Sequence, residues 1–431
     1  MSNVVHLPRP QKDRSQAPPI ALYFRVGRDQ HKDMLDLLAQ GEKGFFGLVI
    51  EARYAHRHRE LRTEALHKGL DVVLDPNTHA MATIGGHTTG TAELPWGLSR
   101  PNRADDFSGV DGQTRAKQIV EFARANRFTQ LLGPTHLLSS ANDIWLRRDI
   151  EMMRWVHDEL RRADLRIPLI YPLALPFQIL RDPVQRQAII SAISDAPSDA
   201  IWLRVENFGQ DATGEKVAAY IAACEDFRVL DRPLVADHVS GLPGLALLAF
   251  GSVGGLAHGV TFFESFKPSA WRRPKPDTEQ GGGTSTRIYF AGLDMLMKAK
   301  DARAFLDSST RVKSHFGCRN THCCPRGPKD QLENPTRHYV HTRSEQVLQM
   351  ASTPADLRIG RYLDDHVRLV SDGIAAVSGF GPINAKLKKA VEKKQKTISR
   401  FRQAMAHLAK SHGLREPMES PLSRSAREQK K

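Results

Sequence analysis

Eight short apolar runs, most of them rich in β-branched residues, recur along the chain with segments of helical periodicity between them. They occupy residues 21–26, 47–52, 71–75, 129–132, 168–172, 200–205, 233–237 and 255–263. The runs are nearly continuous rather than alternating, as in strands that a parallel sheet buries on both faces. Eight such β–α alternations predict a (β/α)8 TIM-like barrel, and a doubly wound open sheet remains the alternative.

The segments between the runs have the spacing of amphipathic helices. These helices are predicted at 31–38, 54–67, 114–125, 146–163, 183–193, 215–226 and 244–250. No G-x-G-x-x-G follows the first run, so dinucleotide binding has no support. Beyond the barrel, helices are predicted at 289–306, 345–350, 356–370 and 385–411.

Composition suggests five parts. We predict a disordered leader (1–19), the barrel (20–310), a Cys/His subdomain (311–345), C-terminal helices (346–412) and a disordered basic tail (413–431). The leader lacks the apolar core of a signal peptide, and no run approaches the ~18–20 apolar residues of a membrane span. Only Cys224 lies outside one cysteine cluster, so a disulfide framework is excluded. We expect a soluble cytoplasmic protein.

Positive charge is concentrated near the C-terminus. The net charge is +14, and residues 386–431 contain fourteen Lys/Arg against four Glu, or +10 of that total. A near-neutral body with a basic C-terminal segment favours a polyanionic partner, namely tRNA or DNA. The alternative is a solvated helix and a frayed terminus with no partner.

A cluster of cysteines and histidines follows the predicted barrel. Cys318, Cys323 and Cys324 lie within seven residues, and histidines at positions 315, 322, 338 and 341 surround them. Thiolates and imidazoles together are the ligands of zinc. We predict a structural Zn²⁺ site formed by Cys318, Cys323, Cys324 and His341, with His338 as the other possible fourth ligand. Exposed or redox-active vicinal thiols are the alternative.

Polar residues follow almost every predicted strand, where a barrel has its active site. They are Arg25, Arg28, Glu51, Arg53, Asp75, Asn77, His79, Thr135, His136, Arg204, Glu206, Asn207, Asp237, His238 and Glu264. Two carboxylates on different strands can divide the work of nucleophile and general acid/base, which draws attention to Asp75 and Glu264. Each position alone could equally cap the next helix.

A long irregular stretch, residues 76–111, follows Asp75 and is predicted to be a lid or binding element. Its Trp96 could stack on a planar base or pack the loop against the body.

Three motifs in this order resemble the tRNA-guanine transglycosylases and their DNA-acting relatives. They are Leu74-Asp75-Pro76-Asn77, Val239-Ser240-Gly241-Leu242-Pro243, and residues 258–269 (HGVTFFESFKPS) with Glu264 at the nucleophile position. The family's Ser-Gly-Gly-Phe-Gln is absent after Asp75, Glu replaces its Asp nucleophile, and the cysteine spacing differs.

The resemblance implies a (β/α)8 barrel with a late zinc-binding insertion and a base-exchange or glycosidase reaction on nucleic acid. Glu264 would attack the anomeric carbon, and Asp75 would handle the proton of the base. Substrate would contact Arg204, Glu206 and Trp96, and also Arg272 and Arg273 in the loop after the eighth run.

Two other functions remain open at this point. One is a non-catalytic barrel that binds nucleic acid or a protein, which the degenerate motifs favour. The other is a small-molecule lyase or hydrolase with Asp237, His238, His258 and Glu206 as acid/base groups or metal ligands.

Overall fold

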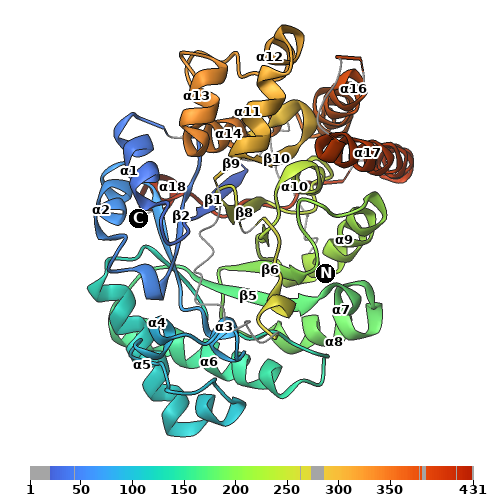
Figure 1. Cartoon of the computed structure of the whole chain (residues 1–431). Helices are drawn as coiled ribbons and strands as arrows, with labels where there is room; N and C mark the ends of the chain where they lie inside the picture. The colour runs from blue at the N-terminus through green and yellow to red at the C-terminus, as the bar shows by residue number, and fades with distance from the viewer. Residues whose placement is uncertain are drawn as a thin grey trace.

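The computed structural model describes residues 20–42, 44–262, 264–272, 286–377, 379–380, 385–413 and 415–429. Eight parallel strands form a closed barrel in chain order, each paired with the next and the eighth with the first (Figure 1). They are β1 (Ala21–Arg25), β2 (Gly47–Glu51), β3 (Asp71–Asp75), β4 (Gln130–Leu132), β5 (Leu169–Pro176), β6 (Ala200–Glu206), β7 (Leu234–Asp237) and β8 (Gly255–Gly259). Every predicted strand is confirmed, and the open sheet is excluded.

The barrel interior is filled by side chains that alternate along each strand. The apolar interior consists of Ala21, Tyr23, Val49, Val73, Leu132, Ile170, Ala200, Trp202, Val235 and Ala257. Tyr23 and Trp202 meet within it with their ring centroids 5.0 Å apart. Side chains two residues further along a strand lie on the same face, so Arg25, Asp75, Arg204 and Asp237 also face the interior, toward the carboxyl ends of their strands.

Helices surround the barrel where the sequence predicts them. They are α1 (His31–Ala39), α2 (Arg59–His67), α5 (Gly109–Ala125), α6 (Ile144–Arg162), α8 (Pro183–Ile193), α9 (Gly214–Phe227) and α10 (Gly241–Ala249). The eighth position belongs to α14 (Pro335–Ser352), which packs against both α10 and α1 (Figure 1). The Cys/His segment therefore lies between β8 and the eighth helix, and α14 crosses the boundary predicted at residue 345.

The helix predicted at 289–306 is wrong in its first half. An antiparallel hairpin of β9 (Arg287–Phe290) and β10 (Met295–Lys298) precedes α11 (Ala299–Asp307). Asp294 turns the chain in a left-handed conformation with φ 44°. Its buried carboxylate accepts hydrogen bonds from Tyr289 and Arg343, a tertiary requirement that helical spacing does not reveal.

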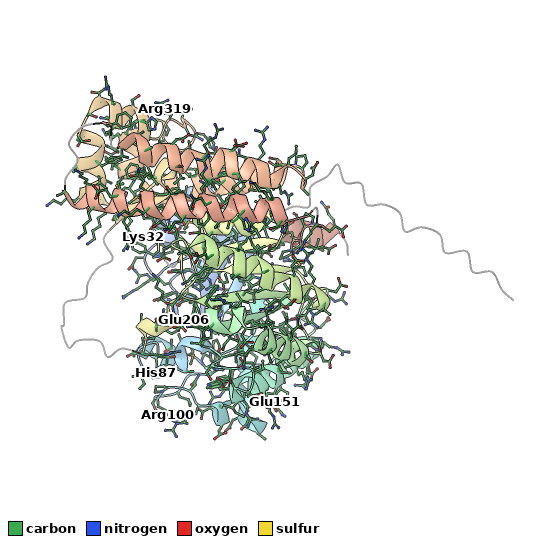
Figure 2. The ribbon with its side chains drawn as sticks, turned by 90° about the vertical axis from the view of Figure 1, so that its right-hand side faces the viewer. Lys32, His87, Arg100, Glu151, Glu206 and Arg319 are labelled. Atoms are coloured by element: carbon green, nitrogen blue, oxygen red, sulfur yellow. The ribbon has the colours of Figure 1, made fainter. Side chains whose placement is uncertain are left out.

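Shorter helices complete the insertion and the C-terminal part. They are α12 (Thr310–Phe316), α13 (Pro328–Glu333), α15 (Arg358–Arg361), a π-helical turn (Tyr362–Arg368), α16 (Leu369–Val377) and α17 (Ala385–Ser411). The α17 helix packs against α9 and α16, and its Phe401 and Ala404 lie next to Gly214 of α9 (Figures 1 and 2).

The C-terminal tail is ordered over residues 415–429, which corrects the prediction of disorder. The Met418 amide donates to the Gly251 carbonyl at 2.8 Å, and α18 (Arg424–Gln429) follows. Arg427 forms an ion pair with Asp71, whose side chain is fully buried at the N-terminal end of β3. A basic side chain of the tail thus compensates a buried carboxylate, which composition alone does not show. The leader (1–19) and residues 430–431 lie outside the described residues.

A search of the described helices finds none that combines the length and the apolar character needed to cross a bilayer.

Candidate functional site

Four buried charged side chains from four strands form one network at the carboxyl end of the barrel. Arg25 on β1 donates to both oxygens of Asp237 (2.6 and 2.5 Å) and to Asp75 (2.9 Å). Arg204 on β6 donates to the same two carboxylates, at 2.7 Å in each case. We call these four residues the mouth network. The sequence predicted three of them as site residues and noted Arg25 only as a polar strand end.

The mouth network fixes the charge of its carboxylates. Burial by itself would raise the pKa of Asp75, but the guanidinium groups of Arg204 and Arg25 outweigh burial and hold that pKa well below its usual range. Burial is likewise outweighed at Asp237, chiefly by Arg25, so its pKa is also lowered. Both groups are therefore permanent carboxylates that orient the arginines, and they are poor proton acceptors at neutral pH.

Two histidines lie beside the mouth network in the neutral form. Burial, reinforced by Arg204, lowers the pKa of His79, and burial together with Arg25 lowers the pKa of His238 to about 3. The Nδ1 of His79 lies 3.1 Å from Nη1 of Arg204. Because a guanidinium only donates, His79 accepts there, and its proton sits on Nε2 as a donor for another group.

The backbone at the same end of the barrel is held in an unusual conformation. Asn77, Asn207, His238 and Thr261, each within two residues of a strand end, have φ values of 62°, 59°, 62° and 60°. Left-handed backbone at non-glycine residues is unfavourable, most of all for a β-branched residue such as Thr261. Four such residues around one rim are typical of a functional site.

The segment that follows β8 covers the mouth. Phe266 pairs with the end of β6, where the Asn207 amide donates to its carbonyl at 3.1 Å. Its ring lies 5.6 Å from that of His79 and 5.4 Å from that of His238, and Trp271 also contacts His79. This arrangement covers His79, which is 6% exposed, and the buried arginines beneath it, whereas His238 stays partly exposed to solvent.

Glu206 is a further carboxylate on the inward face of β6, two residues beyond Arg204. Its side chain is 6% exposed, and no hydrogen bond to it is found within the described part of the chain. In Figure 2 it lies at the same end of the barrel as His87 and Arg100, which belong to the long loop after β3. Glu206 is therefore available to a substrate in a way that Asp75 and Asp237 are not.

Glu264 lies in separate surroundings from Asp75. Its Oε1 accepts hydrogen bonds from Ser240 at 2.7 Å and from Tyr339 of α14, and Arg343 of the same helix is 3.6 Å away. Burial raises the pKa of Glu264, and Arg343 only partly opposes this. The contacts of Glu264 thus join the segment after β8 to the eighth helix, and it shares no partner with Asp75 among the described residues.

Among the predicted substrate-binding residues, two need correction and one lies outside the described residues. Trp96 is fully buried, donates to the Pro76 carbonyl and packs on Phe122, so it anchors the loop and cannot stack on a base. Arg204 has Nε, Nη1 and Nη2 already paired with Asp237, His79 and Asp75, so its guanidinium is not free to bind a substrate. Arg272 is exposed, and Arg273 lies outside the described residues.

The cysteine cluster is a second site, and its fourth member corrects the prediction. Cys318, Cys323, Cys324 and His338 bring their ligand atoms within 4.8 Å of one another, in a group that could hold a metal ion. The sulfur of Cys323 is 3.4 Å from each of the other two sulfurs, and Nδ1 of His338 is 3.6 Å from Cys324. Tetrahedral zinc–thiolate ligands are about 3.8 Å apart, so the set has the size of a zinc site.

The orientation of His338 supports its role as ligand. Its Nε2 lies 3.0 Å from the Tyr289 carbonyl, which can only accept, so Nδ1 carries the lone pair that faces the thiols. His341, one turn further along α14, instead points to Glu42 (2.9 Å) and Glu345 (3.0 Å) and groups with His322. Helical spacing places both histidines on one side of α14, and only the tertiary contacts distinguish them.

No protein-family model and no curated protein sequence matches the chain. Among solved structures, the intracellular xylanase of Thermoanaerobacterium saccharolyticum is 12% identical with a TM-score of 0.37, covering 60% of this chain and 90% of that chain. A type I 3-dehydroquinate dehydratase from Clostridium difficile is 9% identical with a TM-score of 0.35, covering 59% and 90%. The thiamine phosphate pyrophosphorylase of Pyrococcus furiosus is 11% identical with a TM-score of 0.30, covering 59% and 92%. Such distant similarity says nothing about activity, so the function is inferred from geometry.

Proposed function

We propose that the protein is an enzyme of lyase or hydrolase type that acts on a small polar substrate at the barrel mouth. The observation that carries this proposal is the mouth network itself, buried at the catalytic end of the fold and ringed by four left-handed residues. Buried ion pairs of this kind contribute little net stability compared with apolar packing. Their presence at this end of the barrel therefore favours a role in catalysis.

Each group has a distinct role in this reaction. Glu206 gives a proton to the substrate or takes one from it, because it is the inward carboxylate that no guanidinium holds in the described structure. The Nε2–H of His79 donates to negative charge that develops on a substrate oxygen. Asp75 and Asp237 hold Arg204 in place, and Arg204 in turn fixes Nδ1 of His79, so the Nε2–H donor is oriented before the substrate arrives.

A paired substitution tests the proton-transfer role. The purified chain is incubated with a pooled extract of cell metabolites, and consumption of each compound is followed by mass spectrometry. Glu206→Gln is expected to reduce turnover of any consumed compound by at least about a hundredfold, the usual contribution of a general acid or base. Glu264→Gln keeps the hydrogen bonds from Ser240 and Tyr339 to Oε1 and is expected to retain activity.

The two variants also separate this proposal from its rival. Equal turnover by the wild type and Glu206→Gln, or no turnover by the wild type, would contradict a catalytic mouth that uses Glu206. Loss of activity in Glu264→Gln alone would instead point to a reaction with Glu264 as nucleophile.

That rival is a transglycosylase-like reaction on nucleic acid, and two observations favour it. The Cys3His cluster is inserted between β8 and the eighth helix, as the family resemblance implies. A basic solvent face of α17 that includes Lys389, Lys393 and Arg400 would attract the phosphate backbone. We propose zinc as the metal in either case, with a structural role because four protein ligands leave no open position.

A further inference from the structure

An open cavity of about 640 Å³ lies between α2 and α5, and none of the four mouth-network residues lines it. The residues of α2 that line it include Arg59, Arg62 and Leu66, and the end of α5 contributes Phe122. The short helix α4 (Thr89–Ala92) and the residues after it form a third wall. The volume falls within the range of small-molecule and cofactor sites.

Positive charge dominates the lining of this cavity. Four arginines face it, at positions 53, 59, 62 and 127, and Glu93 is the one carboxylate among its lining residues. Arg53 is already paired with Glu51 at 2.7 Å, but Arg59 and Arg127 have exposed side chains with no ion pair seen among the described residues. The lining therefore has an excess of positive charge that an anion would neutralise.

Arg62 gives the most specific indication that the cavity binds an anion. Its side chain is 6% exposed, and its guanidinium donates to the carbonyl and side-chain oxygens of Asn126. Its Nε is buried without a hydrogen-bond partner, and no carboxylate pairs with the group in the described part of the chain. Burial, with the nearby Arg59, lowers the pKa of Arg62 to about 10, so it is still charged at neutral pH. The guanidinium also lies 5.1 Å from the centroid of the Phe128 ring, but a buried guanidinium without a carboxylate partner is costly unless an anion completes its surroundings.

Each of the three walls also contributes an apolar side chain. Leu66, Leu94 and Phe122 line the same cavity, so a ligand that fits it has an anionic end and a less polar body. Several guanidinium groups lining one cavity match the several oxygens and double charge of a phosphate monoester better than a single carboxylate. We propose that this cavity binds a phosphate monoester of about nucleotide size, with the phosphoryl group on Arg59, Arg62 and Arg127. The proposal is independent of the reaction at the barrel mouth.

Isothermal titration of the full chain with AMP and with phenyl phosphate tests the proposal. Both are expected to bind, whereas adenosine and phenol, which lack the phosphoryl group, are expected to bind at least about tenfold more weakly. The double variant Arg59→Gln/Arg127→Gly is expected to weaken both phosphate esters by at least about tenfold. Arg127 has φ 57°, a conformation that glycine adopts without strain, so the double variant is expected to fold normally.

Arg124→Gln provides the matched control, because Arg124 is exposed near the end of α5, three residues before Arg127, and does not line the cavity. It is expected to leave binding of both esters within about twofold of the wild type. Absence of binding by both esters, or equal binding by the wild type and the double variant, would overturn the proposal. A single-stranded oligonucleotide is titrated in parallel, and binding of the oligonucleotide without either ester would also overturn it.

Discussion

Asp237→Asn is expected to destabilise the protein by about 3–5 kcal/mol, the usual cost of removing one partner from a buried ion pair. Asp237 is fully buried and accepts hydrogen bonds from Arg25 and Arg204. An uncharged amide in its place leaves two guanidinium groups with Asp75 as their one acidic partner in the mouth network. The measurement is the free energy of unfolding from urea denaturation, followed by circular dichroism.

Asp29→Asn is the matched control. Asp29 pairs with Arg57 at 2.7 Å, but its side chain is 75% exposed, so this pair contributes less than about 1 kcal/mol. If Asp237→Asn loses no more stability than Asp29→Asn, the four charges do not form one buried network.

The loss of unfolding free energy caused by Asp237→Asn also has a predictable pH dependence. The folded-state pKa values of Asp75 and Asp237 are lower than the ~3.9 of an unfolded Asp. Their contribution to stability is therefore complete above about pH 4 and is lost as the pH falls toward the folded-state values. The difference in unfolding free energy between wild type and variant is expected to be constant from pH 5 to 8 and to narrow below about pH 4. A difference that grows in acid would contradict this charge assignment.

His338→Ala is expected to abolish tight binding of one metal ion per chain and to destabilise the C-terminal part of the protein. A metal ion held by the four ligands would connect the Cys318–Cys324 segment to α14, the eighth helix of the barrel. Zinc-finger peptides gain about 10–16 kcal/mol from their metal, but much of this chain buries an apolar core independently of it. A loss of several kcal/mol is therefore expected, measured as a lower unfolding temperature alongside metal content by mass spectrometry.

His341→Ala is the control that the structure provides. His341 lies on the same helix, but its ring nitrogens face Glu42 and Glu345 rather than the thiols. This variant is expected to retain the metal at wild-type stoichiometry. Metal loss in His341→Ala with retention in His338→Ala would reverse the ligand assignment, and a metal-free wild type would contradict the zinc site.

The sequence was sufficient to predict the barrel because strands buried on both faces must be apolar along their whole length. All eight runs became strands, within a few residues of their predicted bounds. The polar residues at the strand ends were predicted for the same reason, since the C-terminal rim of such a barrel is where polar groups gather. Asp75, Arg204 and Asp237 were identified in this way.

Roles within that rim depended on contacts between segments far apart in the chain. Inward and outward positions alternate along a strand. Arg25 faces the barrel interior, whereas His258 faces outward, where its ring packs on Phe24 and on Tyr339 of α14. The apolar character of Trp96 was visible, but its burial against Phe122 required the path of the whole loop after β3. The open cavity between α2 and α5 likewise joins residues that no local pattern connects.

The amino-acid sequence by itself determined the architecture, the rim of polar residues and the presence of a thiol cluster, because apolar periodicity and ligand type are local properties. The tertiary structure decided which carboxylates are held by arginine, which histidine faces the thiols and where Glu264 lies. Those outcomes depend on which side chains meet across long sequence separations, and on the burial that then fixes their charge.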